Sequence, residues 1–146
     1  MNKLSIDQLN LKDKRVLVRV DFNVPLDDKG NITDDRRIVA SLLTIKKIIN
    51  DGGKTILMSH LGRPKGRVKP EFSLKPAATK LGELLGREVK LAPDCIGDKV
   101  KNMVAEMKDG DVILLENLRF HEEEEKNNLA FKQIKWKFII EIKLLF

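Results

Sequence analysis

The chain is poor in the residues that mark several protein classes. Its 146 residues include a single cysteine, Cys95, which excludes an internal disulfide and fits a reducing, cytoplasmic compartment. It has one tryptophan and no tyrosine, and it lacks the aromatic signature of RNA-binding modules. No apolar run approaches the length that spans a bilayer, and the first residues lack the apolar core of a secretory signal. We therefore expect a cytoplasmic protein without a membrane or nucleic-acid partner.

Metal and cofactor motifs are equally scarce. No cysteine and histidine spacing typical of a zinc site occurs, and no glycine-rich dinucleotide fingerprint is present. The segment Gly53-Lys54-Thr55 is similar to the end of a phosphate-binding loop, but Ile48 stands where that loop needs its first glycine. The glycine pair also precedes a predicted strand instead of following one. The sequence therefore predicts no metal and no bound cofactor in this chain.

The charge balance favours an anionic partner. The formal net charge is +6, which either reflects ordinary solubility or attracts an acidic surface, a nucleic acid or an anionic metabolite. Basic residues alternate with acidic ones through most of the chain, so we favour a small anion over nucleic acid.

Hydrophobic periodicity predicts an α/β fold. Continuous apolar runs such as 112–115 are typical of strands covered on both faces of a parallel sheet. Segments with apolar residues at helical spacing alternate with these runs, which favours right-handed crossovers and helices flanking the sheet. The predicted strands are 15–20, 55–59, 88–92 and 112–115, and the predicted helices are 35–49, 74–86 and 96–108.

Polar side chains follow three of the predicted strands directly. The carboxyl ends of parallel strands meet at one edge of a sheet, where ligands of open α/β folds bind. Positive side chains outnumber the single aspartate among the polar residues at this edge, so the ligand we expect is a small anion. The group at this rim comprises Asp21, Asn23, His60, Arg63, Arg119 and His121.

Each rim signal also has a plain structural explanation. Asp21 and Asn23 could simply satisfy the amides of a strand exit, and residues 60–63 could be a surface loop. Arg119 could form an ion pair with Glu116 or Glu122. Arg36 and Arg37 stand at a predicted helix start, where the helix dipole disfavours cations unless an anion binds there.

Four segments together resemble the phosphoglycerate kinase family, in its order and spacing, and the resemblance covers residues 1–131. They are 19–25 (RVDFNVP), 32–38 (ITDDRRI), 59–64 (SHLGRP) and 116–121 (ENLRFH).

This resemblance implies a glycolytic enzyme that transfers a phosphoryl group reversibly between ATP and 3-phosphoglycerate. Family members have two lobes and are usually monomeric, and residues 1–131 would be an incomplete N-terminal lobe with a Rossmann-like sheet. That lobe binds 3-phosphoglycerate or 1,3-bisphosphoglycerate, while the other lobe binds Mg-ATP. The resemblance makes Arg37 the catalytic arginine and assigns substrate binding to Asp21, Asn23, Arg37, His60, Leu61, Gly62, Arg63 and Arg119, with no metal ligand.

Residues 132–146 depart from the pattern. Their apolar residues alternate with a strand period, where an α/β fold would next have a helix. We interpret them as an unrelated tail, read out of frame or from a truncated gene end. It is aggregation-prone and lies beside a sheet edge that we expect to be open. The chain alone is then expected to be inactive, and two alternatives remain: a non-catalytic small-anion binding module, or a non-functional truncated product.

Overall fold

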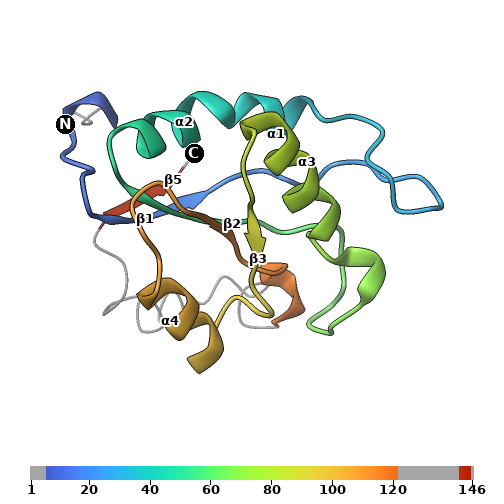
Figure 1. The fold of residues 1–146 in the computed structure, drawn as a ribbon. Coiled ribbons are helices and arrows are strands. Elements are labelled where there is room, and N and C mark those ends of the chain that lie inside the picture. Colours follow the sequence, from blue (N-terminus) through green and yellow to red (C-terminus); the bar gives the residue numbers. More distant parts are fainter. Residues whose placement is uncertain (1–5, 122–141, 146) are drawn as a thin grey trace, which may run out of the picture.

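A single parallel sheet forms the centre of the computed structural model, which describes residues 6–121 and 142–145. Its five strands lie in the order β3-β4-β2-β1-β5, and every neighbouring pair is parallel (Figure 1). The strands are β1 (Arg15–Arg19), β2 (Lys54–Met58), β3 (Lys90–Leu91), β4 (Val112–Leu114) and β5 (Ile142–Leu145).

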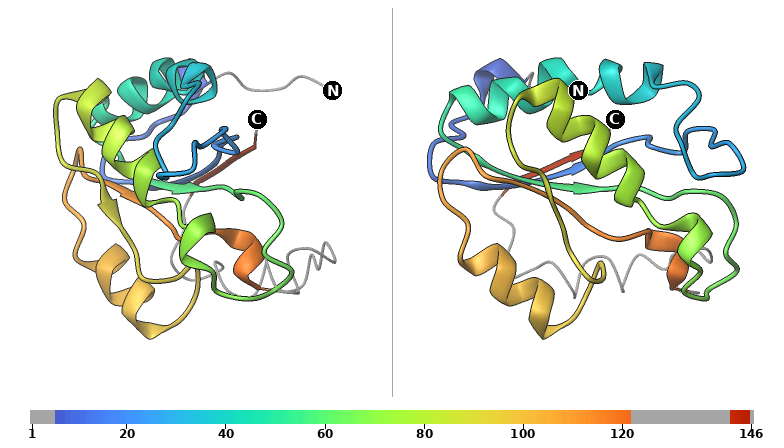
Figure 2. Two further views of the ribbon diagram at one scale, coloured as in Figure 1. Left: turned by 90° about the vertical axis from the view of Figure 1, so that its right-hand side faces the viewer. Right: turned by 45° about the vertical axis from the view of Figure 1, so that its right-hand side comes forward.

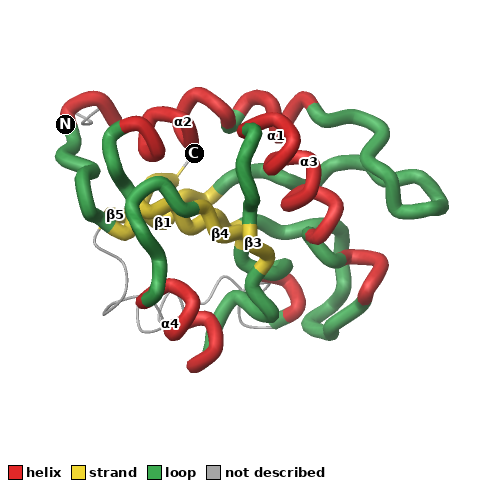
Figure 3. Tube along the Cα trace, in the orientation of Figure 1, coloured by secondary structure: helices red, strands yellow, loops and turns green. Residues whose placement is uncertain are grey.

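Helices cover both faces of this sheet. In Figures 1 and 2, α1 (Arg36–Ala40), α2 (Leu42–Asn50) and α3 (Lys75–Leu85) lie on one side, and α4 (Asp98–Ala105) lies on the other. Figure 3 shows the strands as one layer between these helical segments. Three short 3₁₀ turns complete the described elements: η1 (Ile6–Gln8), η2 (Pro70–Phe72) and η3 (Leu118–Phe120).

The continuous apolar runs are explained by this two-sided burial. Along β1, Val16 and Val18 join the core beneath α1, α2 and α3, whereas Leu17 joins the core beneath α4. The same alternation occurs in β2 and β4, because successive side chains of a strand point to opposite faces. Because both faces are buried, the strand centres are apolar except for the buried Thr55 of β2, and the predicted α/β class with a parallel sheet is confirmed.

The first predicted helix is divided in two. Ser41 separates α1 from α2, and its hydroxyl donates a hydrogen bond of 2.6 Å to the Ile38 carbonyl oxygen. A serine that bonds back to the preceding turn bends a helix, a local competition that hydrophobic spacing does not report. The other two predicted helices are confirmed with shorter bounds, and α3 ends at Gly86 in the left-handed conformation, with a φ of 68°.

The fifth strand comes from the segment predicted to be an unrelated tail. β5 lies parallel to β1, with Ile142 opposite Val16 and Leu145 opposite Arg19. The expectation of an open sheet edge is therefore wrong along β1. The strand period predicted for this segment is confirmed at residues 142–145, and the remaining tail residues and the acidic run 122–125 lie outside the described residues. Within the described part, no helix has the length and apolar character needed to cross a membrane.

Candidate functional site

The loops that follow β1, β2 and β4 are joined by hydrogen bonds at the carboxyl edge of the sheet. The amide of Phe22 donates to the Ser59 hydroxyl at 2.9 Å, and the amide of Gly62 donates to Asn23 Oδ1 at 2.9 Å. The carbonyl of Ser59 in turn accepts from the amide of Leu118 at 3.0 Å. The structure thus brings together the three strand-end loops as the sequence predicts.

Asn117 is the central connection among these loops, and its side chain is fully buried. Its Oδ1 accepts from the amides of Leu61 (3.2 Å) and Arg119 (3.0 Å). Its Nδ2 donates to the carbonyl oxygens of Leu61 (2.7 Å) and Phe72 (2.9 Å). Two donors and two acceptors are therefore all used, which exhausts the ordinary capacity of an amide side chain. Asn117 was not among the predicted site residues, although it lies inside the 116–121 segment.

Gly62 allows the β2 loop to pack closely. Its φ is 61°, and a Cβ built at this position would lie 2.5 and 2.6 Å from ring atoms of Phe72. A side chain is thus excluded both by the backbone conformation and by the ring. This close packing holds the loop that carries His60 and Arg63 against the turn η2.

Arg37 reaches the β1 loop from α1. Its guanidinium donates to the carbonyl oxygen of Asn23 at 2.5 Å and lies 3.4 Å from Asp21 Oδ1. The Arg37 and Asp21 side chains remain 54% and 62% exposed, so this ion pair is accessible to a ligand. A hollow of about 750 Å³ borders Arg37, lined by Asn23, Val24, Pro25, Asp34, Arg36, Arg37 and Ala40.

Arg36 is balanced within its own turn. Asp34 accepts hydrogen bonds from the Arg36 side chain at 3.0 and 2.6 Å and from its amide at 3.0 Å. These hydrogen bonds, those from the side chain above all, lower the pKa of Asp34 to about 2. Asp34 therefore offsets the unfavourable position of a cation at the start of α1, and the structure does not need a bound anion there to explain Arg36.

The other predicted site residues lie around the hydrogen-bonded loops after β1, β2 and β4. Arg63 is exposed on the β2 loop, whereas His60 and Arg119 are half-buried. The backbone of Arg119 is held on both sides, because its amide bonds to Asn117 and its carbonyl oxygen accepts from Gly66 at 3.1 Å. Three arginines thus come from separate elements to the same edge: Arg37 from α1, Arg63 from the β2 loop and Arg119 from η3.

Glu116, suggested above as a structural partner of Arg119, has a different role. Its carboxylate accepts from the Ser73 hydroxyl at 2.7 Å, from the Leu74 amide at 2.8 Å and from the Asn117 amide at 2.9 Å. It therefore joins the end of β4 to the start of α3. Ser73 precedes the N-cap Leu74, and its hydroxyl oxygen also accepts from the Lys75 amide at 3.2 Å.

The remaining rim residue, His121, is engaged with a fourth loop. Its Nε2 lies 2.6 Å from Asp94 Oδ1, in the loop after β3. Gly52 and Gly53 connect α2 to β2, which is the reverse of the strand-to-helix order of a phosphate-binding loop. The interpretation of Gly53-Lys54-Thr55 as unrelated to such a loop is confirmed.

Comparison with known proteins identifies a family. The family model described as phosphoglycerate kinase matches residues 6–141. The chain is 62% identical over 131 residues to a phosphoglycerate kinase of Chloroherpeton thalassium and 58% identical to one of Chlorobium chlorochromatii, covering 90% of this chain and 33% of each relative.

Solved structures agree with this match. The structure of phosphoglycerate kinase from Pyrococcus horikoshii superposes with a TM-score of 0.88 at 31% identity, covering 98% of this chain and 36% of that one. The one from Coxiella burnetii gives 0.83 at 38% identity, covering 97% of this chain and 34% of that one. The chain thus spans about a third of the length of the relatives it matches.

Proposed function

The chain belongs to the phosphoglycerate kinase family, and on that premise we propose that its described residues form the part that binds 3-phosphoglycerate. One observation carries the proposal: the hydrogen-bonded loops after β1, β2 and β4 gather three arginines and His60 at one edge of the sheet. A parallel sheet binds its ligand beyond this edge, and a carboxylate joined to a phosphate is an anion that several cations can hold.

The proposed roles follow from position and chemistry. Asp21 and Asn23 face the hydroxyl and carboxylate end of the substrate, while His60, Arg63 and Arg119 belong to the patch that holds the anion, and Leu61 and Gly62 shape the loop that carries it. Arg37 is the catalytic arginine, because its guanidinium is always charged and its planar fork can stabilise a transferring phosphoryl group. Its present bonds to Asn23 and Asp21 keep it at the rim until the substrate competes for it.

Complete phosphoryl transfer needs more than this anion site. Mg-ATP supplies the phosphoryl group and the charge neutralisation in such reactions, and we assign its binding to the two thirds of the family's length that this chain does not match. The proposal is therefore a substrate-binding unit of a cytoplasmic kinase that has no turnover as an isolated chain. A non-catalytic module that binds small anions at the same rim is the alternative.

The experiment is a titration of the chain with 3-phosphoglycerate followed by NMR. Arg63→Ala and Arg119→Ala should each weaken binding about 10- to 150-fold, which corresponds to about 1.5–3 kcal/mol for losing a charged hydrogen-bonding partner. Lys108→Ala is the matched control, because it removes an exposed positive charge in the turn before β4, at the opposite edge of the sheet.

Unchanged affinity in both arginine variants would refute the site. In parallel, a coupled assay with ATP and 3-phosphoglycerate should show no turnover above a blank prepared from host cells without the chain. Binding of inorganic phosphate with the same affinity as 3-phosphoglycerate would instead favour the general anion-binding module.

A further inference from the structure

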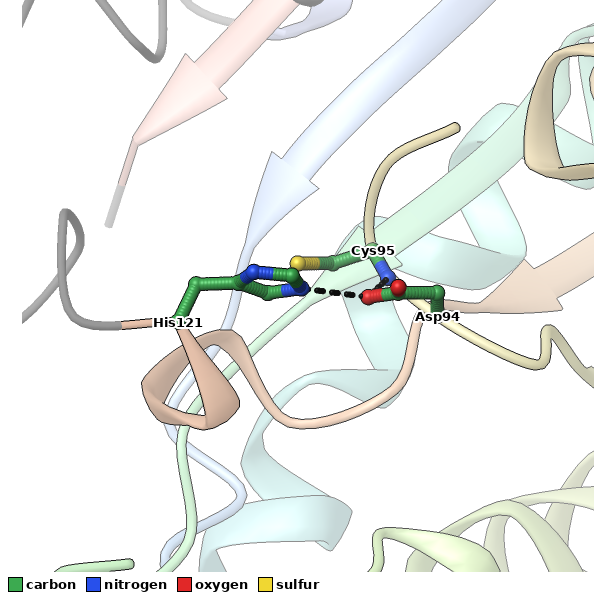
Figure 4. A group of neighbouring side chains, drawn as sticks. All are labelled: Asp94, Cys95 and His121. Atoms are coloured by element: carbon green, nitrogen blue, oxygen red, sulfur yellow. Dashed lines mark hydrogen bonds and ion pairs between the residues drawn. The ribbon is translucent and has the colours of Figure 1, made fainter. Parts of the chain in front are cut away.

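Asp94, Cys95 and His121 form a compact cluster beside the residues proposed to bind the substrate, and His121 is a rim residue to which the proposed function gives no role (Figure 4). Asp94 and Cys95 lie in the loop between β3 and α4, and His121 directly follows η3. One ligand atom from each residue lies within 4.8 Å of the other two. Among the described residues, no other group of three metal-ligating side chains approaches this closely.

The three donors match the preference of one class of cation. Thiolate, imidazole and carboxylate are the ligands that zinc takes in proteins, at about 2.3 Å for sulfur and about 2.0–2.2 Å for nitrogen and oxygen. In a tetrahedral site these bond lengths place the ligand atoms about 3.3–3.6 Å apart. To reach this geometry, the 2.6 Å contact between His121 Nε2 and Asp94 Oδ1 must open by less than about 1 Å, and the Cys95 sulfur, which lies within 4.8 Å of both other ligand atoms, must come to about 3.5 Å from each.

Burial orients the cluster toward solvent on one side. Cys95 is 1% exposed and forms the inner wall, whereas the His121 and Asp94 side chains are 24% and 43% exposed. An ion can therefore enter past the histidine and the carboxylate and reach the sulfur. A second hydrogen bond fixes the Asp94 side chain. Its Oδ1 also accepts from the Cys95 amide at 2.6 Å, which keeps the carboxylate beside the thiol.

We propose that Asp94, Cys95 and His121 bind one divalent zinc-class cation, with the fourth coordination position open to solvent. The metal takes the place of the hydrogen bond between His121 Nε2 and Asp94 Oδ1, so that the neutral imidazole binds through Nε2 with its single proton moved to Nδ1, and Asp94 binds as the carboxylate. The Cys95 thiol releases its proton to solvent and binds as the thiolate. The site thus gains a 2+ charge and loses the thiol proton, and no redox partner is involved.

The position of this site suggests a consequence for the neighbouring rim. His121 directly follows η3, which contains Arg119. Asn117 holds the start of η3 through its hydrogen bond to the Arg119 amide. A metal that joins His121 to the loop after β3 also fixes the end of η3. The metal site itself does not depend on the proposed function, because metal binding is measured without any substrate.

The test is calorimetric titration of the full chain with Zn²⁺ in the presence of a thiol-free reductant, followed by titration with Co²⁺. One Zn²⁺ should bind per chain, and Co²⁺ should give a thiolate charge-transfer absorption, which can come only from Cys95 because it is the single cysteine. Cys95→Ser, His121→Ala and Asp94→Asn should each weaken Zn²⁺ binding at least about tenfold, the loss expected even for residues that only support a ligand. His60→Ala is the matched control, because it removes the other histidine and should leave the Zn²⁺ affinity unchanged.

Circular dichroism of each variant separates loss of the site from loss of the fold. If Cys95→Ser does not fold, the half-exposed Asp94→Asn decides the question. Zn²⁺ should also raise the melting temperature of the unmodified chain, because binding to the folded state adds stability, and it should not raise that of His121→Ala. Absence of Zn²⁺ binding, binding without the thiolate absorption, or equal affinity in His121→Ala and the unmodified chain would each overturn the proposal.

Discussion

Replacing Asn117 with alanine tests the central connection of the rim. The substitution removes an amide that is fully buried and makes four hydrogen bonds to the backbone, three to the segments of Leu61 and Phe72 and one within its own turn to Arg119. The two bonds to Leu61 are the most costly to lose, because that residue is 5% exposed and its amide and carbonyl oxygen would remain without a replacement from water.

The magnitude follows from the groups left unpaired. An unsatisfied buried donor or acceptor costs about 1–3 kcal/mol, so the two groups of Leu61 alone predict a loss of about 2–6 kcal/mol. The free energy of unfolding of a natural domain is about 5–15 kcal/mol. Asn117→Ala should therefore remove a large fraction of the stability and loosen the loop that carries His60 and Arg63.

Urea unfolding followed by circular dichroism measures this effect as a lower midpoint with an unchanged slope. Asn102→Ala is the matched control, because Asn102 is exposed on α4 and its replacement should change stability by less than about 0.5 kcal/mol. A loss below about 1 kcal/mol for Asn117→Ala, with the control unchanged, would refute the assignment of this residue as the connection between the loops.

Three further predictions concern other parts of the chain. Gly62→Ala should destabilise the fold by at least about 1 kcal/mol in urea unfolding, because the left-handed conformation disfavours a side chain and the Cβ meets the Phe72 ring; an unchanged midpoint would contradict this packing. The pKa of Asp34 should be about 2 in an NMR titration and should return toward 3.8 in Arg36→Ala; because the folded pKa is depressed, this pair's contribution is present above about pH 4 and is lost as the pH falls toward 2. Leu144→Pro should lower the urea midpoint, since proline removes a ladder hydrogen bond and β5 covers the edge of β1; a higher soluble yield with no loss of stability would show that β5 adds nothing to the sheet.

The parallel sheet could be predicted because burial on both faces constrains composition directly. A strand such as β2 must be apolar at consecutive positions, and the helices between strands must repeat every 3.6 residues. The convergence of Asn23, Gly62 and Arg119 also follows from sequence, because parallel strands place their carboxyl ends together. The division of the first helix at Ser41 could not be predicted from sequence. The Ser41 hydroxyl acts through one hydrogen bond to the backbone and leaves the hydrophobic period of the helix unchanged.

The predicted tail shows what the spacing of apolar residues cannot determine. The spacing of two correctly predicts a strand at residues 142–145, but it cannot say which edge accepts that strand. β2 occupies one edge of β1, so only the opposite edge can accept a further strand. The family match ends at residue 141, just before β5, whereas the structure from Pyrococcus horikoshii superposes over 98% of this chain.

The amino-acid sequence by itself determined the α/β class, the strand order along the chain and the residues delivered to the carboxyl edge, because these depend on periodicities of two and 3.6 residues. The tertiary structure decided which polar groups meet. Asn117 bonds to Leu61 across 56 residues, and His121 reaches Asp94 across 27. Such contacts arise from crossover connections that return the chain to the same edge, and a hydrogen bond depends on atomic separations within a few tenths of an ångström, which no spacing along the chain encodes.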